Sequence, residues 1–324
     1  MIRKIIATVL VLLLLLPASA GCQRTDDGKI TVLCTVFPIY DWVKNVVGEN
    51  DGVEVRLLVS NGTDIHSYQP TAADVFDIRS AEMIVRVGGS SDGFLDDILK
   101  KHPDGERIDL QLIDEEGVAL RDVSSESVVG EGHAHTHECD HGHENVDEHI
   151  WLSIKNAAAS VTAIYRALAE IDADGAEGYR ARAEAYTEAL SALDAEFSQA
   201  VASVSEPRVL FADRFPFVYL MEDYGVEYVA AFRGCTTEVD ATFETVARLS
   251  DKLDEWELSC VSVTESSDGE LAESVIAASA SKSARFAVFD SMQATAQSEI
   301  DGGKTYVGTM KNNLEVLKDA ISAS

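Results

Sequence analysis

Basic residues are scarce in this sequence: 26 Lys and Arg stand against 56 Asp and Glu, which gives a net charge of −30. This surplus repels phosphate backbones, so we expect no nucleic-acid partner, and it suits a secreted protein whose ligand is a cation. Four cysteines remain beyond residue 22, too scattered for a disulfide scaffold, and their pairing stays open. The sequence also lacks the HExxH motif, which counts against a zinc hydrolase.

Long apolar runs are missing except at the N-terminus. Residues 1–22 combine a basic start, the apolar run Ile5–Leu16 and small residues that lead to Cys22. The run is too short to span a bilayer comfortably and indicates a secretion signal. Because the end of the segment resembles a bacterial lipobox, we expect Cys22 to be lipidated and residues 23–29 to form a tether. The alternative is an ordinary signal peptide that is cleaved near Ala20.

Short apolar runs alternate with helical patterns in two halves of the remaining chain. This alternation predicts parallel strands with crossover helices, hence an α/β fold of two β/α lobes, residues 30–173 and 205–324. The expected strands are 30–36, 53–59, 83–87 and 150–152 in the first half, and 208–211, 226–231, 258–263 and 285–289 in the second. Helices are expected after Pro38, after the capping residue Thr71, and over 244–253, 270–278 and 311–321.

A different pattern lies between the halves. Apolar residues recur every three or four positions from Tyr179 to Val204, which predicts one continuous amphipathic helix. Its length would be about 40 Å at 1.5 Å per residue. We expect residues 174–204 to form a rigid helix that connects the two lobes and limits their hinge motion.

A histidine-rich tract, residues 131–145, is the most conspicuous polar segment. Imidazole is the commonest protein ligand for zinc, and Asp and Glu are interspersed, so the tract is expected to be a solvated loop that gathers cations. Its histidines are His133, His135, His137, His141 and His143, with Cys139 among them. The alternative is a fortuitous polar loop.

Other polar residues stand where a binding cleft is expected. Ligands of open parallel sheets bind beyond the carboxyl ends of the strands. Four such positions follow expected strands, namely His66, Asp213, Glu265 and Asp290, and His149 precedes the apolar residues 150–152. These side chains should converge on one cleft between the lobes, with the tract as an accessory to it.

Several segments resemble the solute-binding proteins of metal-uptake ABC transporters, which are receptors for zinc and manganese. Residues 66–71, HSYQPT, are similar to the HSYEPTP motif of that family, and residues 148–152, EHIWL, to its DPHVWLDP motif. Residues 35–41 resemble TTFPLYD, residues 234–238 resemble GISPE, and residues from 305 onward resemble TYLSMMRYNLDTL. The resemblance covers nearly all of the mature chain, and the histidine-rich insertion is typical of the zinc-type members.

The resemblance implies a metal between two lobes. His66 and His149 match the first two ligands, and Asp290 matches an aspartate that many members supply. At the third position the direct match is Ala212, which cannot bind a metal. The candidates to replace it are Asp213, Cys235 and Glu265. Alternatively, a water molecule fills the third position. Asp213 could then orient another ligand, or pair with Arg214 or Arg233.

The resemblance also implies a function without catalysis. We expect an extracytoplasmic, lipid-anchored monomer that captures a divalent metal and delivers it to a membrane permease. Two imidazoles with carboxylates suit Zn2+, and more oxygen ligands would suit Mn2+ or Fe2+; the tract favours zinc. The rival hypotheses are a secreted zinc hydrolase, which would need an open metal position with water, and a metal-buffering adhesin that uses only the tract.

Overall fold

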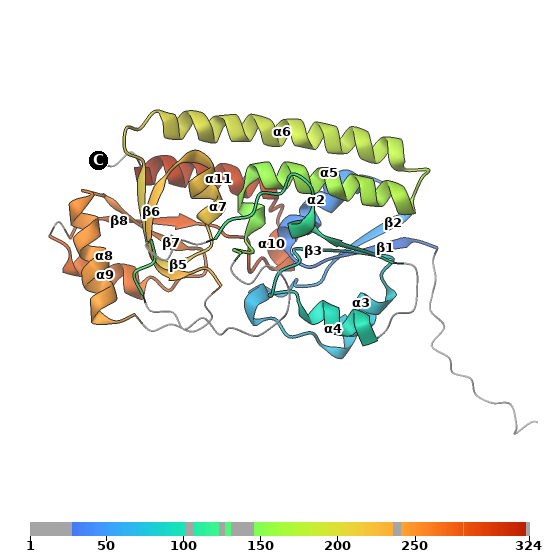
Figure 1. Ribbon diagram of the computed structural model, residues 1–324, viewed down its shortest axis with the longest axis horizontal. Coiled ribbons are helices and arrows are strands. Elements are labelled where there is room, and N and C mark those ends of the chain that lie inside the picture. The colour runs from blue at the N-terminus through green and yellow to red at the C-terminus, as the bar shows by residue number, and fades with distance from the viewer. Residues whose placement is uncertain are drawn as a thin grey trace, which may run out of the picture.

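Two lobes, each built on a four-stranded parallel sheet, lie side by side under one long helix (Figure 1). The structure, a computed structural model, describes residues 28–101, 107–122, 127–130, 146–235, 241–280 and 282–321. The expected fold class is therefore confirmed. The signal segment with Cys22 and the histidine-rich tract, residues 131–145, lie outside the described residues.

The N-terminal lobe has the strand order β2-β1-β3-β4, with all neighbours parallel. Its strands are β1 (Ile30–Cys34), β2 (Val53–Leu57), β3 (Met83–Arg86) and β4 (Ile108–Gln111). Its helices are α2 (Phe37–Val47), α3 (Ala72–Ser80), α4 (Phe94–Lys101) and α5 (Ile154–Ile171), with short 3₁₀ helices η2 (Ile65–Ser67), η3 (Leu112–Asp114) and η4 (Ile150–Leu152).

The C-terminal lobe repeats this plan with the strand order β6-β5-β7-β8. Its strands are β5 (Arg208–Phe215), β6 (Glu227–Arg233), β7 (Cys260–Thr264) and β8 (Arg285–Phe289). Its helices are α7 (Val218–Tyr224), α8 (Phe243–Glu255), α9 (Glu270–Ala278), α10 (Gln297–Asp301) and α11 (Tyr306–Ile321).

Local signals explain most of these boundaries. Pro38 stands in the first turn of α2, where a backbone N–H has no acceptor within the helix, so the N–H that proline lacks is not needed there. Gly48 ends the helix with φ +59°. Thr71 caps α3 as expected, in a reciprocal capping box with Asp74. The last helix, α11, begins at Tyr306, five positions before the expected start at Lys311.

Two sequence-based assignments in the N-terminal lobe were wrong. Residues 150–152 form the 3₁₀ helix η4 rather than a strand, because the amides of Leu152 and Ser153 bond back to the carbonyls of His149 and Ile150. All three residues of η4 are buried, so their apolar run carries no alternation that would separate a strand from a helical turn. Conversely, β4 was missed: it is only four residues long and Leu110 alone in it is buried.

The connecting helix α6 (Ala176–Ala202) runs along the top of both lobes in Figure 1. It packs along α5 and α2 of the N-terminal lobe and against α11 and α7. The ring of Phe197 stacks on Tyr224 of α7, with centroids 5.1 Å apart. A single hydrophobic core cluster continues through both lobes, from Trp42 to Phe211 and Met310.

A second connection crosses between the lobes. We call residues 119–122 and 127–130 the strap. Its first residue is held on α5 by two hydrogen bonds with Asn156, and the Arg121 guanidinium pairs with Glu222 at 2.9 Å. Residues 127–130 then pair in parallel with β6, through Val129 N–Ala230 O at 2.9 Å and Gly130 N–Ala231 O at 2.8 Å. The strap thus adds a strand-like edge to the sheet of the C-terminal lobe.

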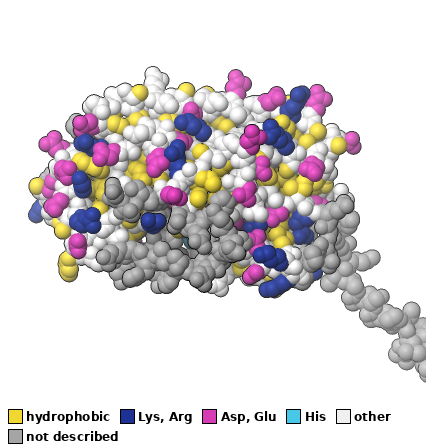
Figure 2. Space-filling view, viewed as in Figure 1, with side chains coloured by type: hydrophobic (Ala, Val, Ile, Leu, Met, Phe, Trp, Pro, Cys, Tyr) yellow, Lys and Arg dark blue, Asp and Glu magenta, His cyan; other side chains and the backbone are white. Residues whose placement is uncertain are grey.

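On the face drawn in Figure 2, Asp and Glu side chains are scattered over both lobes and interspersed with Lys and Arg. Among the described residues, none of the helices combines the length and apolar character needed to cross a membrane.

Candidate metal site

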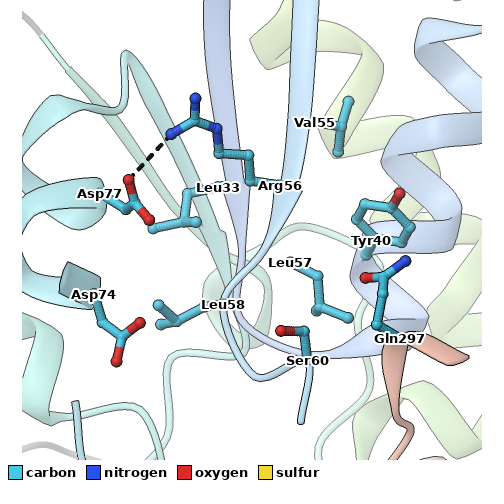
Figure 3. A pocket seen from close by; sticks show the side chains of 10 residues that line it. All are labelled: Leu33, Tyr40, Val55, Arg56, Leu57, Leu58, Ser60, Asp74, Asp77 and Gln297. Atoms are coloured by element: carbon cyan, nitrogen blue, oxygen red, sulfur yellow. Dashed lines mark hydrogen bonds and ion pairs between the residues drawn. The ribbon is translucent and has the colours of Figure 1, made fainter. Parts of the chain in front are cut away.

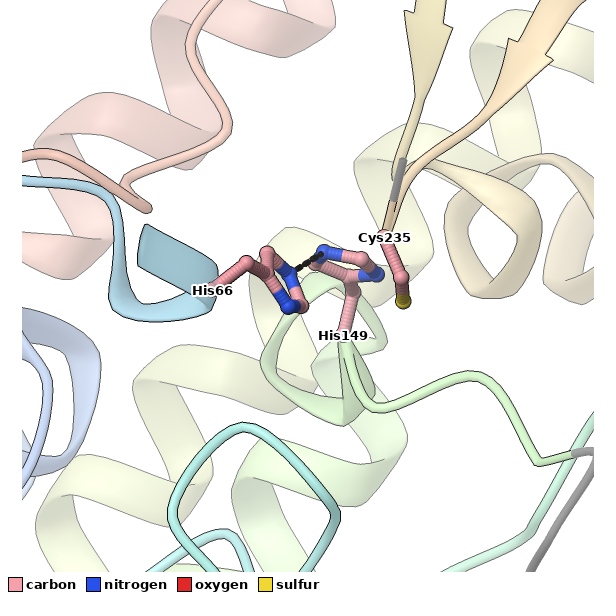
Figure 4. Close-up of side chains that lie close together, drawn as sticks. All are labelled: His66, His149 and Cys235. Atoms are coloured by element: carbon pink, nitrogen blue, oxygen red, sulfur yellow. Dashed lines mark hydrogen bonds between the residues drawn. The ribbon is translucent and has the colours of Figure 1, made fainter. Parts of the chain in front are cut away.

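Three side chains from three separate segments meet between the lobes (Figure 4). His66 comes from η2, His149 directly precedes η4, and Cys235 follows β6. The Nε2 atoms of the two histidines are 3.1 Å apart, and one ligand atom from each of the three residues lies within 4.8 Å of the others. Two imidazoles and a thiol are ligands that zinc prefers in proteins.

His66 is held in place by its own short helix and by a neighbouring turn. Asp64 caps η2, accepting a hydrogen bond from the His66 backbone N–H at 3.0 Å, and its other oxygen pairs with Arg214 of β5 at 3.0 Å. The ring Nδ1 lies 2.7 Å from Ser91 Oγ. His66 is therefore oriented from both lobes, since Arg214 belongs to the C-terminal sheet.

Glu148 fixes the serine that contacts His66. Its carboxylate accepts hydrogen bonds from the backbone N–H and the hydroxyl of Ser90, both at 2.5 Å. It also accepts from the backbone N–H of Ser91 at 3.0 Å and from the Ser91 hydroxyl. Burial alone would raise the pKa of Glu148, but these hydrogen bonds lower it below its ordinary value. The ionised carboxylate directs the Ser91 proton toward itself, which leaves the Ser91 oxygen to accept from His66 Nδ1–H.

A buried arginine anchors the turn that carries these serines. Arg86, only 1% exposed, binds Asp109 at 2.8 Å and Asp96 at 2.6 Å and lies 3.8 Å from Asp92. Asp92 in turn accepts hydrogen bonds from the backbone N–H groups of Val87 and Gly88. The cluster therefore supports the turn from beneath, at the carboxyl end of β3.

His149 is fully buried and is held by Asp147. The Asp147 carboxylate accepts from the His149 backbone N–H at 2.9 Å and from Nδ1 at 2.8 Å, and Tyr219 O–H donates to the Asp147 carbonyl at 2.6 Å. Burial would lower the pKa of His149, but the charge and hydrogen bond of Asp147 raise it overall. A carboxylate on Nδ1 fixes the tautomer of the ring and makes Nε2 a better ligand.

The electrostatics of the two rings follow from these partners. With Nδ1–H donating to Asp147 in one ring and to Ser91 in the other, both Nε2 atoms present lone pairs to the same point. Burial and the neighbouring His149 lower the pKa of His66 to about 4, so the ring is neutral at physiological pH. His149, whose pKa is raised, must lose any proton on Nε2 before the two rings can hold a cation together.

Cys235 completes the group from the C-terminal lobe. The residue as a whole is exposed. Desolvation of its thiol and the negative charges of Asp147 and Glu148 raise the pKa of that thiol well above its ordinary value. The preceding Gly234 permits the approach: a Cβ there would lie 2.8 Å from Cε1 of His149 and from the Pro216 Cα. Backbone and ring are thus in contact, which only glycine allows.

The expected carboxylates are engaged elsewhere. Asp290 pairs with Lys304 at 2.8 Å, and Glu265 accepts hydrogen bonds from the backbone and hydroxyl of Ser291 at 2.8 and 2.7 Å. Asp213 accepts from the backbone and hydroxyl of Thr264 at 2.9 and 2.6 Å. Ala212 is buried in β5. Glu265 and Asp290 follow β7 and β8 as expected, but the expectation for Asp213 was wrong: it lies within β5, which continues to Phe215 rather than ending at residue 211. The group of three includes none of these carboxylates.

One further residue at the site, Gln293, was not predicted from the sequence. Its side-chain Nε2 contacts His149 Nε2 and lies 3.3 Å from His66 Nε2, and the residue is only 6% exposed. An amide is not among the residue types that a search for metal ligands singles out. The feature of the sequence that could have indicated Gln293 is its position in the loop after β8, three residues beyond the expected ligand Asp290.

A separate pocket is lined by residues of β1, β2, α2 and α3 of the N-terminal lobe and by one residue of α10. It has a volume of about 330 Å³ and is lined by Tyr40, Leu57, Asp74 and Gln297 among others (Figure 3). The cationic side chain in its wall, Arg56, pairs with Asp77 at 3.0 Å and with Glu54 at 2.8 Å. No histidine or cysteine is among its lining residues.

Comparison with known proteins places this geometry in context. Residues 32–320 match the family described as "Zinc-uptake complex component A periplasmic". The zinc-binding lipoprotein AdcA of Streptococcus pneumoniae is 26% identical over 296 residues, which cover 91% of this chain and 56% of AdcA. The high-affinity zinc uptake system protein ZnuA of Bacillus subtilis is 25% identical over 304 residues, 94% of this chain and 91% of ZnuA. This chain thus spans little more than half the length of the AdcA relatives.

A solved structure shows the same fold. The Zn(II)-bound ZnuA-like domain of Streptococcus pneumoniae AdcA superposes with a TM-score of 0.71 at 23% identity, over 91% of this chain and 99% of that domain. The likeness covers both lobes and the helix that joins them.

Proposed function

The chain belongs to the family of periplasmic component A proteins of zinc-uptake complexes, and we propose that it is the extracytoplasmic solute-binding component of a metal ABC transporter. It captures a divalent cation, Zn2+, between its lobes and delivers it to a membrane permease. The observation that carries this proposal is the convergence of His66, His149 and Cys235 from both lobes on one point. A secreted zinc hydrolase and a metal-buffering adhesin are not favoured, because members of this family are transport proteins.

The proposed ligands are His66 Nε2, His149 Nε2 and Cys235 Sγ. The carboxylates of Asp290, Glu265 and Asp213 keep their present partners, Lys304, Ser291 and Thr264. A thiolate with two imidazoles favours zinc over Mn2+ or Fe2+, which prefer sites with more oxygen ligands. We therefore expect Zn2+ to displace Mn2+ from the protein in a competition titration.

Equilibrium dialysis against zinc tests the site. The unaltered protein should bind one Zn2+ tightly, and His66→Ala should abolish that tight binding. The matched control is His133→Ala, which removes a histidine of the tract and should leave the tight site intact. Tight stoichiometric binding by His66→Ala would contradict the proposal.

The tract acts in this proposal as an accessory collector. Deletion of residues 131–144 should leave one tight zinc site and reduce the number of weaker ones. The residues that flank the tract support this expectation, because the backbone N–H of Asp147 bonds to the Arg121 carbonyl at 2.8 Å and so fixes the segment before His149. Loss of the tight site on deletion would refute the accessory role.

We propose that Cys22 anchors the protein, as a monomer, to the outer face of the membrane. Support comes from the lipobox-like sequence and from a relative that is named a lipoprotein. Labelling of growing cells with a fatty-acid analogue should mark the unaltered protein and spare Cys22→Ala. Equal labelling of both would contradict the anchor.

A further inference from the structure

Gln293 is delivered into the metal site by a constrained turn. Met292, the residue before it, has φ +61°, a left-handed conformation that is uncommon and costly for a side chain of this kind. The turn is held by hydrogen bonds from the Met292 backbone to Asp290 at 2.9 Å and from the Trp151 indole to the Ser291 carbonyl at 2.9 Å. The buried amide of Gln293 therefore points at the two imidazoles by construction.

The contacts of this amide are chemically specific. When both rings are neutral and Asp147 and Ser91 accept the Nδ1 protons, both Nε2 atoms are acceptors, and they face each other at 3.1 Å. Two buried lone pairs at that distance repel unless a cation or a donor lies between them. The side-chain NH2 of a glutamine carries two protons, one for each ring, and Gln293 Nε2 lies against both.

We propose that Gln293 competes with the metal for this site: in the metal-free protein its NH2 group donates to both imidazoles and occupies the point at which a metal would bind. The metal takes the place of the amide nitrogen when it binds, because an NH2 group and a cation cannot share the same lone pairs. Gln293 thus weakens metal binding and favours release. This inference rests on the proposed function of the site.

The variant Gln293→Leu removes the donors and supplies no metal ligand. Without the competing amide, we expect the dissociation constant for Zn2+ to fall by about tenfold, the size that one net hydrogen bond allows. The matched control is Gln297→Leu in α10, whose amide bonds to Asp301 at 2.9 Å on the surface and should leave the constant unchanged. An unchanged or weaker affinity of Gln293→Leu would overturn the proposal. A weaker affinity would indicate that the amide oxygen is a metal ligand, and an unchanged affinity that the side chain has no effect on metal binding.

A spectroscopic measurement separates this inference from the proposed function. In the metal-free protein, the side-chain NH2 of Gln293 should show slow exchange with water and hydrogen-bond couplings to both imidazole Nε2 nitrogens in 15N-resolved NMR. One equivalent of Zn2+ should abolish both signatures. Absence of the couplings in the metal-free protein overturns the role of Gln293 whatever the zinc affinity. Failure of the unaltered protein to bind zinc would instead refute the proposed function and leave the couplings as evidence for the amide contact.

Discussion

One carboxylate oxygen of Asp147 holds His149 at two points. Oδ1 accepts from the backbone N–H of His149 at 2.9 Å and from its Nδ1 at 2.8 Å, so the position and the tautomer of the ring depend on the same atom. Such partners of a metal-binding histidine contribute substantially to affinity although they never touch the metal.

Asp147→Asn should weaken zinc binding about 10- to 100-fold, because the amide carries no charge to support the ring and can present an N–H toward it. Isothermal titration calorimetry measures the change. The control is Asp97→Asn on the exposed side of α4, which should bind as the unaltered protein does. Equal affinity of the two variants would show that Asp147 serves only the fold.

Zinc affinity should fall as the pH falls, in steps set by the two histidines. Asp147 raises the pKa of His149 above 6.5, so below that pKa a proton must leave the ring before zinc binds. His66, with a pKa of about 4, competes only in more acidic solution. Between these values the logarithm of the dissociation constant should rise by about two units for each unit that the pH falls, one from His149 and one from the Cys235 thiol, whose raised pKa keeps it protonated.

Zinc binding should also release one proton from Cys235, because its raised pKa keeps the thiol protonated in the metal-free protein. Calorimetry in buffers of different ionisation enthalpy counts the released protons. Cys235→Ser should release one fewer than the unaltered protein. The same count for both would exclude the thiolate as a ligand.

Gly234→Ala should reduce zinc affinity, because its Cβ would lie 2.8 Å from His149 Cε1 and from backbone at Pro216, and one of them must move. Gly52→Ala is the control, since a Cβ there meets only the Asn50 side chain, at 3.2 Å. Zinc titrations of both variants give the comparison. Full affinity in Gly234→Ala would mean that the loop after β6 adapts freely.

Arg86→Met should lower the free energy of unfolding by about 3–5 kcal/mol, because it leaves Asp92 buried without its cation. Arg56→Met removes a partly exposed arginine with two carboxylate partners and should cost no more than about 1 kcal/mol. Urea denaturation of the metal-free proteins tests both. Similar values for the two variants would contradict a special role for the buried cluster.

The fold was largely predictable, because hydrophobic periodicity and caps are local signals. Thr71 and Gly48 marked helix boundaries, and the spacing from Tyr179 onward predicted α6 within two residues at each end. The strand β4 and the helical turn at 150–152 were not predictable, because short segments take their conformation from neighbours rather than from their own pattern.

The site was predictable where the side chain itself carries the chemistry. His66 and His149 were singled out by residue type and position, and the structure brings them together. The engagement of Asp290 depends on Lys304, which lies fourteen positions away, and the role of Gln293 depends on a left-handed residue before it. Pairings of this kind depend on packing, which a single sequence does not reveal.

The strap has a consequence for how the protein unfolds. A fragment confined to residues 205–324 would leave the outer edge of β6 with open backbone groups, since residues 127–130 supply its partners there. The lobes also share one hydrophobic core cluster. Although they resemble two domains in shape, the shared cluster and the strap should make the lobes unfold together, so the metal-free chain should melt in one transition and neither half should be stable when expressed alone.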